Sequence, residues 1–295
     1  MCKSLFPHFW THWTPTSHRE TLVLGIIQDT PLVYWLLAVA FGLAIECTAK
    51  RKISLHHLCV NIASGILVLL SGYLIAAPII TGLANIARSL VGVGWIDLRI
   101  FSETEFVSEI GAAALYLFIF DFFYYWWHRS QHVYPSLWEQ HAVHHSDTEF
   151  GVTTFLRQHW TEVIFQAFLI HLPIIIAFRL TPVTFWVISG IIASFSFFTH
   201  LNLPIQLGSC AWLITSPQLH RLHHSKLPQH ANHNFAAFFP VWDLVFGTYQ
   251  APIRDEFPPT GLMSNEKIES LTEVVGWPMR RWIATLTKMN RRLRR

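Results

Sequence analysis

Residues Ile110 to His132 read IGAAALYLFIFDFFYYWWHRSQH, an apolar run that ends in two histidines four residues apart. From Ile110 to Trp127 the only charged residue is Asp121. A helix needs about 20 apolar residues to cross the hydrocarbon core of a bilayer, and side chains at i and i+4 share one helix face. This stretch therefore predicts a membrane-spanning helix that carries a pair of imidazoles at its end.

The composition of the whole chain repeats both signals. Of its 295 residues, 52% are hydrophobic and 13% are charged, whereas about 25% of the residues of soluble domains are charged. There are 18 histidines, and 13 of them lie between His128 and His233. This composition argues against a disordered chain, a fibre or an ordinary soluble enzyme. The net charge of +3 is too small to suggest nucleic acid as a partner.

Further runs without charge predict more membrane spans. Residues 53–87 contain no Asp, Glu, Lys or Arg, and neither do residues 163–178 or 180–220. We expect an all-α polytopic membrane helix bundle with four to five spans, the last two joined as a hairpin by a short turn at Arg179 and Pro182. The expected spans lie near 30–48, 58–81, 109–127, 162–178 and 182–200. A re-entrant or interfacial pair is the alternative for the last two.

Basic residues predict the orientation of these spans, because they favour the cytoplasmic side of a membrane. Residues 50–52 are all basic, and residues 280–295 hold seven basic side chains and no acidic one. The loop 97–109 carries four acidic residues against Arg99, which suits the far side. Five crossings then place the N-terminus outside and put residues 128–161 and 201–295 together in a cytoplasmic helical cap. The basic tail is expected to contact anionic lipid headgroups.

The cysteines and the N-terminus exclude other classes of protein. Cys2, Cys47, Cys59 and Cys210 form no CxxC motif and no spacing typical of a disulfide framework. A thiolate zinc site and a secreted, disulfide-stapled domain are therefore not expected. The first residues show no cleavable signal peptide.

Three histidine motifs are spaced so that their side chains converge. A HxxxH motif begins at His128, and HxxHH motifs begin at His141 and His220. Imidazole suits iron, copper, zinc and nickel, and so many nitrogens are too many for one ion and enough for two. His200, at the end of the fifth predicted span, is a further contributor. The predicted metal ligands are His128, His132, His141, His144, His145, His200, His220, His223 and His224.

Other polar residues near these motifs are candidates for an outer shell, because a ligating imidazole donates its other ring N–H to an acceptor. The candidate carboxylates are Asp121, Asp147, Glu162 and Asp243. Further candidates for a ligand or outer-shell role are His159, Asn202, His230 and His233. The remaining histidines are expected to be structural or superficial, and they are His8, His12, His18, His56, His57 and His171.

These motifs resemble those of the sterol desaturase / fatty acid hydroxylase superfamily of membrane di-iron enzymes. The residues from Asp121 to His132 look like its first histidine box, His141 to Thr148 like its second, and Thr215 to His224 like its third. The resemblance covers roughly residues 110–260, and it is strongest to the bacterial sterol desaturase-related branch and to alkylglycerol monooxygenase. Three shorter segments also match the pattern, namely Arg157–Glu162, Asn234–Phe235 and Trp242–Thr248.

Four positions depart from the superfamily pattern. Trp160 stands where a proline is usual, and Ala236 stands where a glycine is usual. Histidines also occupy positions 230 and 233, where other polar residues are expected. These departures affect the surroundings of the site more than the ligand set, so they leave the substrate open.

The resemblance implies an oxidoreductase with two iron ions and O₂ as co-substrate, which hydroxylates or desaturates an unactivated C–H bond of a lipid or sterol. It implies two electrons from a separate donor of the cytochrome b5, ferredoxin or reductase type, because the chain has no evident haem, flavin or iron–sulfur motif. It adds Asn234 to the outer-shell candidates. The expected location is a bacterial inner membrane, or the endoplasmic reticulum of a eukaryote, with the site facing the cytoplasm. Residues 1–295 are expected to form one integral membrane domain with a basic helix or tail at 265–295.

Three alternatives stay open. The first is an ether-lipid monooxygenase of the alkylglycerol type. The second is a membrane zinc hydrolase, although no His-Glu-x-x-His motif is present. The third is a metal carrier, which would place ionisable residues along the spans rather than at their ends. In an oxygenase, five aromatic side chains are candidates to line the substrate tunnel, namely Phe122, Phe123, Trp126, Trp127 and Phe155.

Overall fold

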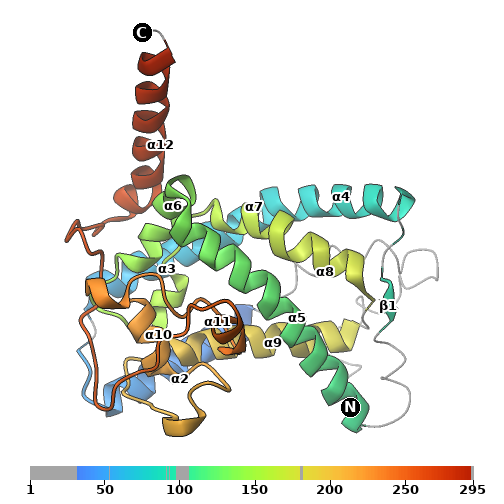
Figure 1. The fold of residues 1–295 in the computed structure, drawn as a ribbon, viewed down its shortest axis with the longest axis horizontal. Helices are drawn as coiled ribbons and strands as arrows, with labels where there is room; N and C mark the ends of the chain where they lie inside the picture. The colour runs from blue at the N-terminus through green and yellow to red at the C-terminus, as the bar shows by residue number, and fades with distance from the viewer. Residues whose placement is uncertain are drawn as a thin grey trace.

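The computed structural model describes residues 32–52, 54–90, 92, 94–97, 106–179 and 182–293, and these are mostly helical (Figure 1). The elements are α2 (Leu32–Thr48), α3 (Leu55–Ser71), η1 (Gly72–Ala76), α4 (Ala77–Leu90), β1 (Ile96–Asp97), α5 (Phe106–Val133), α6 (Pro135–His145), η3 (Val152–Leu156), α7 (Glu162–Gln166), η4 (Ala167–His171), α8 (Leu172–Ala177), β2 (Phe178–Arg179), α9 (Pro182–Thr199), η5 (Gly208–Cys210), α10 (Pro217–His223), η6 (Pro228–His230), α11 (Val241–Val245) and α12 (Leu271–Leu293). The elements η1 and η4 are π-helical turns inside longer helices, and η3, η5 and η6 are short 3₁₀ helices.

Helices stand at all five predicted spans. Two of them, Leu55–Ala87 and Ile110–Val133, are long and apolar enough to cross a membrane by length and composition. The other three predicted spans correspond to shorter apolar helices at Leu36–Thr48, Glu162–Ala177 and Val187–Thr199. The helical fold class is therefore confirmed, and the number of crossings stays a prediction.

The turn between the fourth and fifth predicted spans contains a short strand. Phe178 and Arg179 of β2 pair in parallel with Ile96 and Asp97 of β1. The guanidinium of Arg179 lies 3.7 Å from the carboxylate of Asp97, which adds an ion pair to this contact. The strictly all-α prediction misses this pair, because two residues of strand leave no periodic pattern in a sequence.

Helix α5 crosses the body and packs against α6, η4, α9 and α11 (Figure 1). Its buried apolar side chains, such as Tyr116 and Phe120, join Ile174 of α8, Ile188 of α9 and Phe238 in one cluster. This packing brings the end of α5, with its two histidines, against α6 and the chain that follows α10. Helix α5 is thus the element from which the rest of the candidate site is positioned.

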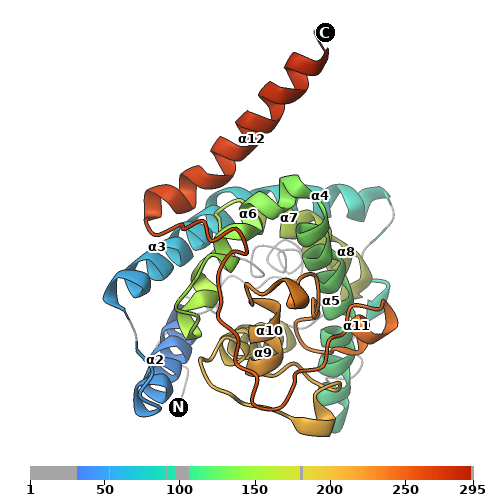
Figure 2. The ribbon, with the colours of Figure 1, turned by 60° about the vertical axis from the view of Figure 1, so that its left-hand side comes forward.

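Helix α12 projects from the body in both views (Figures 1 and 2). Its first turns are anchored, because Val274 is buried with Val143 of α6 and Trp282 donates to the backbone oxygen of Ser136 at 2.7 Å. Further along, Ile283 and Leu286 are exposed.

Several predictions fall outside the described residues. They concern the N-terminal segment with Cys2, His8, His12 and His18, the part of the acidic loop at 98–105, and the last two residues of the basic tail.

Candidate metal centre

The nine predicted ligand histidines lie together and form two groups of imidazoles. Helix α5 contributes His128 and His132, α6 contributes three, α10 with the residue after it contributes three, and His200 follows α9. All nine side chains belong to residues that are buried or half-buried. The first group is His128, His132, His141, His145 and His223, and the second group is His144, His200, His220 and His224.

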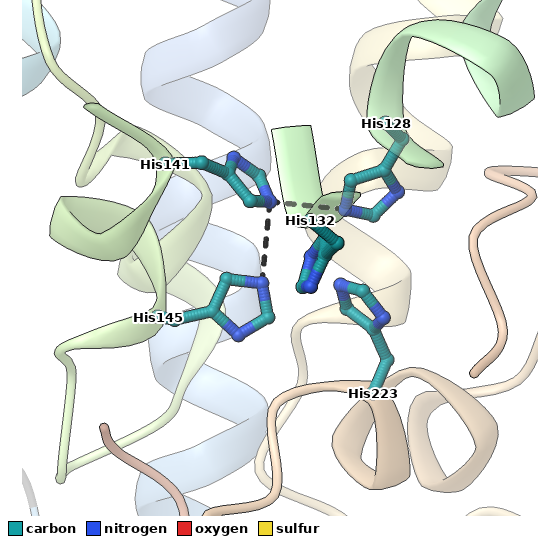
Figure 3. Close-up of side chains that lie close together, drawn as sticks. All are labelled: His128, His132, His141, His145 and His223. Atoms are coloured by element: carbon teal, nitrogen blue, oxygen red, sulfur yellow. Dashed lines mark hydrogen bonds between the residues drawn. The ribbon is translucent and has the colours of Figure 1, made fainter. Parts of the chain in front are cut away.

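The imidazoles of the first group point toward one another (Figure 3). One nitrogen from each lies within 4.8 Å of the others. Nε2 of His141 lies 3.0 Å from Nε2 of His128 and 3.2 Å from Nε2 of His145. The Nε2 atoms of His132 and His223 are buried and have no hydrogen-bond partner within the described residues. Buried polar atoms are normally paired, so these nitrogens call for a ligand.

The second group has the same character with four imidazoles. Nε2 of His200 lies 3.3 Å from Nε2 of His144 and 3.1 Å from Nε2 of His220. The Nε2 atom of His224 is buried and has no partner in the described part of the chain. Phe150, which is 1% exposed, stacks on His200 and covers this group.

Local sequence explains why the histidine helices begin where they do. Pro135 and Pro217 stand in the first turns of α6 and α10, where proline costs no backbone hydrogen bond. The Ser216 hydroxyl accepts a hydrogen bond from the backbone N–H of Leu219 and so caps α10. These starts place each HxxHH motif in the last turn of its helix.

Backbone carbonyls, rather than carboxylates, accept the second ring N–H of four of these histidines. His128 Nδ1 donates to the oxygen of Phe235 at 2.7 Å, and His223 Nδ1 donates to that of His233 at 2.9 Å. In the second group, His144 donates to Arg157 O at 3.2 Å and His200 to Ser196 O at 2.7 Å. These bonds fix the ring orientations and leave Nε2 of each imidazole directed at its group.

The candidate carboxylates Asp121 and Asp243 instead hold the loop that carries one of these carbonyls. Asp243 accepts from the backbone N–H groups of Phe235 and Ala236 at 2.7 and 2.9 Å. Asp121 accepts from the next three N–H groups, those of residues 237–239, at 2.7 to 3.1 Å. Both carboxylates therefore support His128 one step further out than the sequence analysis expected.

Asp147 plays the corresponding role on the side of the second group. Its carboxylate accepts from Thr154 Oγ1 at 2.8 Å and from Asn61 Nδ2 at 3.0 Å. Buried Arg157 donates to Asn61 Oδ1 at 3.1 Å and to the backbone oxygen of Ile268. The carbonyl of Arg157 that orients His144 is thus held by a network of buried polar side chains.

Glu46 on α2 is a supporting residue that the sequence analysis did not single out. Its carboxylate accepts from the backbone N–H of Val152 at 2.9 Å and from that of Asn202 at 2.7 Å. It thereby ties α2 to the segment that follows α6 and to the segment that follows α9. The available signal was a single carboxylate at the end of an apolar run, a place where ionisable side chains usually have a function.

The other outer-shell candidates make bonds away from the imidazole groups. Glu162 accepts from Gln131 at 2.7 Å and from Trp127 at 3.1 Å. Asn202 accepts from Arg221 at 3.1 Å, and Asn234 exchanges hydrogen bonds with the backbone of Gln250.

The three remaining histidine candidates also lie outside both groups. His230 lies 2.9 Å from Ser225 Oγ and 3.0 Å from Glu256. His159 lies 2.6 Å from Thr161 Oγ1 and donates to Val275 O at 3.3 Å, so it anchors α12. His233 contributes its backbone oxygen to His223. Among the described residues, none of these three imidazoles belongs to either imidazole group.

Burial keeps the imidazoles neutral and hence able to bind a metal. It lowers the pKa of His144 to about 4 and that of His223 to about 3. The pKa values of His141, His220 and His224 also lie well below the ordinary value because of burial and neighbouring imidazoles. Neutral imidazole is the form that coordinates metals.

Two openings lie beside the centre, and they share no lining residue. A mostly apolar cavity of about 260 Å³ is lined by Tyr124, whose ring lies 5.4 Å from that of His128, and by Phe155, whose ring lies 5.9 Å from that of His200. A cleft of about 420 Å³ is lined by His132, His145 and His223 of the first group. Of the aromatic residues predicted to line a tunnel, only Phe155 lines this cavity, and Phe122, Phe123, Trp126 and Trp127 do not.

Comparisons with known proteins show which proteins the chain is similar to. Residues 113–248 match the family described as fatty acid hydroxylase. The chain is 34% identical to alkylglycerol monooxygenase of Xenopus tropicalis over 129 residues, which are 44% of this chain and 28% of the relative. It is 32% identical to ornithine lipid hydroxylase OlsE of Rhizobium tropici over 146 residues, 50% of this chain and 44% of the relative.

A more distant relative is the very-long-chain aldehyde decarbonylase GL1-5 of Oryza sativa subsp. indica, 25% identical over 170 residues, 52% of this chain and 26% of the relative. The match therefore spans less than half the length of each of these three relatives. No solved structure matches the chain.

Proposed function

We propose that this chain, whose residues 113–248 match the fatty acid hydroxylase family, is a membrane di-iron oxygenase acting on a lipid or sterol. The observation that carries the proposal is the pair of buried imidazole groups beside an apolar cavity. Its relatives bear the names of a monooxygenase and a hydroxylase, which supports an oxidoreductase. The reaction is hydroxylation or desaturation with O₂ and two electrons from a separate donor.

The donor set fits a pair of iron ions. Nine imidazole nitrogens and no carboxylate make up the two groups, which suits a borderline transition metal such as iron. The buried, unpartnered Nε2 atoms of His132, His223 and His224 are the positions that a metal ion would satisfy. An iron pair held there would supply the reactivity toward O₂ that an unactivated C–H bond requires.

The protein's own contribution is to position the hydrocarbon chain of the substrate and to keep the apolar cavity separate from the cleft. The apolar cavity holds a hydrocarbon chain with one end at the rings of Tyr124 and Phe155. The cleft, which is lined by Glu139 and Arg281 as well as histidines, gives electrons and protons an aqueous route to the first group. An external donor of the cytochrome b5, ferredoxin or reductase type therefore does not compete with the lipid for the same opening.

Metal analysis of the purified protein tests this function. We expect about two irons per chain, and O₂ consumption that depends on lipid and on a reduced donor. His144→Ala and His223→Ala, one from each group, should lower the iron content and abolish oxidation while circular dichroism stays unchanged. Active protein without iron, or turnover without O₂ as a zinc hydrolase would show, would contradict the proposal.

The relatives also favour a second candidate reaction, hydroxylation next to the ether oxygen of an alkylglycerol-type lipid, which cleaves the ether. Comparing the lipids of a deletion strain with those of the wild type distinguishes the reactions. A lipid class that carries one more oxygen or two fewer hydrogens in the wild type than in the deletion strain indicates simple hydroxylation or desaturation. Accumulation of intact ether lipids in the deletion strain indicates cleavage.

We further propose that the chain is one integral membrane domain of about five spans, with the site at the cytoplasmic surface of a bacterial inner membrane or of the endoplasmic reticulum. Two apolar helices of sufficient length and the basic clusters at residues 50–52 and 280–295 support this topology. Exposed Cys210 allows a direct test. A membrane-impermeant maleimide should label Cys210 in inside-out vesicles and not in right-side-out ones, and the reverse pattern would overturn the orientation.

A further inference from the structure

The apolar cavity carries a row of aromatic side chains that leads to the metal centre. Tyr116, Phe120 and Tyr124 of α5 line the cavity, and His128 follows at the same spacing of four residues. Neighbouring ring centroids lie 6.5, 6.1 and 5.4 Å apart along this row. Residues four apart share a helix face, so one wall of the cavity runs along α5 and ends at the first imidazole group.

This wall is not uniformly apolar. The hydroxyls of Tyr116 and Tyr124 make no hydrogen bond to the described residues, and neither oxygen is among the fully buried unpartnered atoms, so both remain accessible from the cavity. His171 also lines the cavity, and its ring nitrogens make no hydrogen bond to the described residues. Polar groups in apolar surroundings are costly when they stay unpaired, so a ligand that pairs with them is favoured.

The backbone around the cavity is also irregular. Gly72 begins the π-helical turn η1 and His171 ends the π-helical turn η4, and both residues line the cavity. Such turns interrupt α-helices at functional sites more often than elsewhere. The turn η4 directly precedes α8, and its last residue, His171, lines the cavity.

Ligand sites of this kind are mostly apolar and use a few polar groups to orient the ligand. We propose that this cavity selects a lipid chain that bears an ether or ester oxygen, and that Tyr124 donates its hydroxyl hydrogen bond to that oxygen beside the metal centre. Tyr116 lies about 12 Å further along α5, at 1.5 Å per residue, and with His171 it pairs with polar groups of the same lipid. This inference rests on the proposed function, because it assigns the substrate class of the same site.

A bare hydrocarbon chain fits the apolar walls but leaves the Tyr124 hydroxyl unpaired. A site with a hydrogen-bonding group discriminates against an analogue that lacks the partner, whereas a purely apolar pocket discriminates weakly between similar chains. Tyr124 is thus a specificity-determining residue, and the metal centre itself does not provide this selection.

Lipid binding to the purified protein, without O₂ or an electron donor, tests the inference. The probes are a 1-O-alkylglycerol, its analogue with CH₂ in place of the ether oxygen, and the 1-acylglycerol of the same chain length, each displacing a fluorescent lipid in detergent. The wild type should bind the ether about tenfold or more tightly than the CH₂ analogue. Tyr124→Phe should remove this preference and leave the affinity for the CH₂ analogue unchanged. Equal affinity of the wild type for ether, ester and CH₂ analogue, or a preference that survives Tyr124→Phe, would overturn the proposal.

Two further variants make the result specific. Tyr73→Phe is the matched control, because Tyr73 is 53% exposed and does not line the cavity, and it should leave all affinities unchanged. Ala193→Phe places bulk in the cavity and should weaken every probe if the ligand lies there. Strong binding that survives Ala193→Phe would contradict the location, provided that its melting curve matches the wild type.

The acylglycerol separates the two sources of oxygen. Tighter binding of the ether indicates an ether lipid, and tighter binding of the ester indicates an acyl lipid, and either supports the inference. Because these affinities are measured without turnover, their failure leaves iron content and O₂ dependence untouched. Conversely, iron-free activity would end the di-iron proposal without changing the lipid preference.

Discussion

The two imidazole groups both take histidines from the α6 and α10 motifs, but they differ in enclosure. In α6, His141 and His145 belong to the first group and His144 to the second. In α10 the division is reversed, since His220 and His224 belong to the second group and His223 to the first. Each i, i+4 pair thus stays together, because it shares one helix face, and the i+3 residue between them serves the neighbouring group.

The surroundings of the groups differ as well. The first group borders the cleft, and Trp138 there lies 5.1 Å from the ring of His132. The second group is covered by Phe150, and none of its four histidines lines the cleft. Each HxxHH motif therefore contributes histidines both to the first group, which borders the cleft, and to the second group, which is covered. The two groups should respond differently to mutation.

The largest expected effect is the loss of a ligand histidine. His141→Ala leaves four imidazoles in the first group, whereas His224→Ala leaves three in the second. Both should lower activity by more than the roughly 10- to 100-fold typical of outer-shell changes, but His224→Ala should release more iron because fewer ligands remain. Iron per chain is the measurement, with His230→Gln as a control outside both groups. Equal iron loss in both variants would mean that the groups bind metal as one unit.

A smaller effect is expected one step further out, at Asp243. Asp243→Asn weakens the hydrogen bonds to the backbone of Phe235 and Ala236, and so disturbs the carbonyl that orients His128. We expect a loss of about 1 to 3 kcal/mol of stability and roughly 10- to 100-fold weaker metal binding confined to the first group. Thermal unfolding and metal titration measure the two quantities. Asp255→Asn at an exposed position is the control. Weaker metal binding at the second group in Asp243→Asn would contradict the expectation that the two groups respond separately.

The smallest effect concerns the anchor of α12 beside α6. Burial lowers the pKa of His159 to about 4, so the folded protein holds this side chain neutral. Below the ordinary pKa of 6.5 the unfolded chain takes up a proton that the folded chain does not. As the pH is lowered from 6.5 to about 4, the contribution of His159 to the free energy of unfolding should therefore fall by about 1 kcal/mol per pH unit.

Unfolding of the metal-free protein at several pH values measures this contribution without interference from metal release. His159→Asn should be less stable than the wild type near neutral pH and should lose less stability on acidification. Parallel curves for the two proteins would show that His159 does not titrate in this range.

Much of the candidate site was predictable because its signals are local. The spacing within residues 128–132, 141–145 and 220–224 sets helix faces, and faces determine which imidazoles can point to one place. The same holds for the helical fold class, because apolar runs of span length bury their backbone groups only as helices. The role of the nine histidines as ligands remains a prediction, which metal analysis addresses.

The outer shell was less predictable. The sequence analysis looked for carboxylates as partners of the imidazoles, whereas the observed partners are carbonyls such as those of Phe235 and Arg157. Every residue has a carbonyl, so composition and spacing carry no signal for this choice. Aromatic residues were likewise assigned to a tunnel wall by type, and only the packing of α5 separates Tyr124 from Trp126.

The sequence alone determined that the chain is apolar and mostly helical, that it carries three histidine motifs, and which family it resembles. These properties depend on residue type and on spacing along one helix. Only the tertiary structure decided how the nine imidazoles divide into two groups, which loops orient them, and which side chains line the cavity. Those outcomes depend on contacts between α5, α6, α9 and α10, which lie far apart in the sequence and meet only when the helices pack.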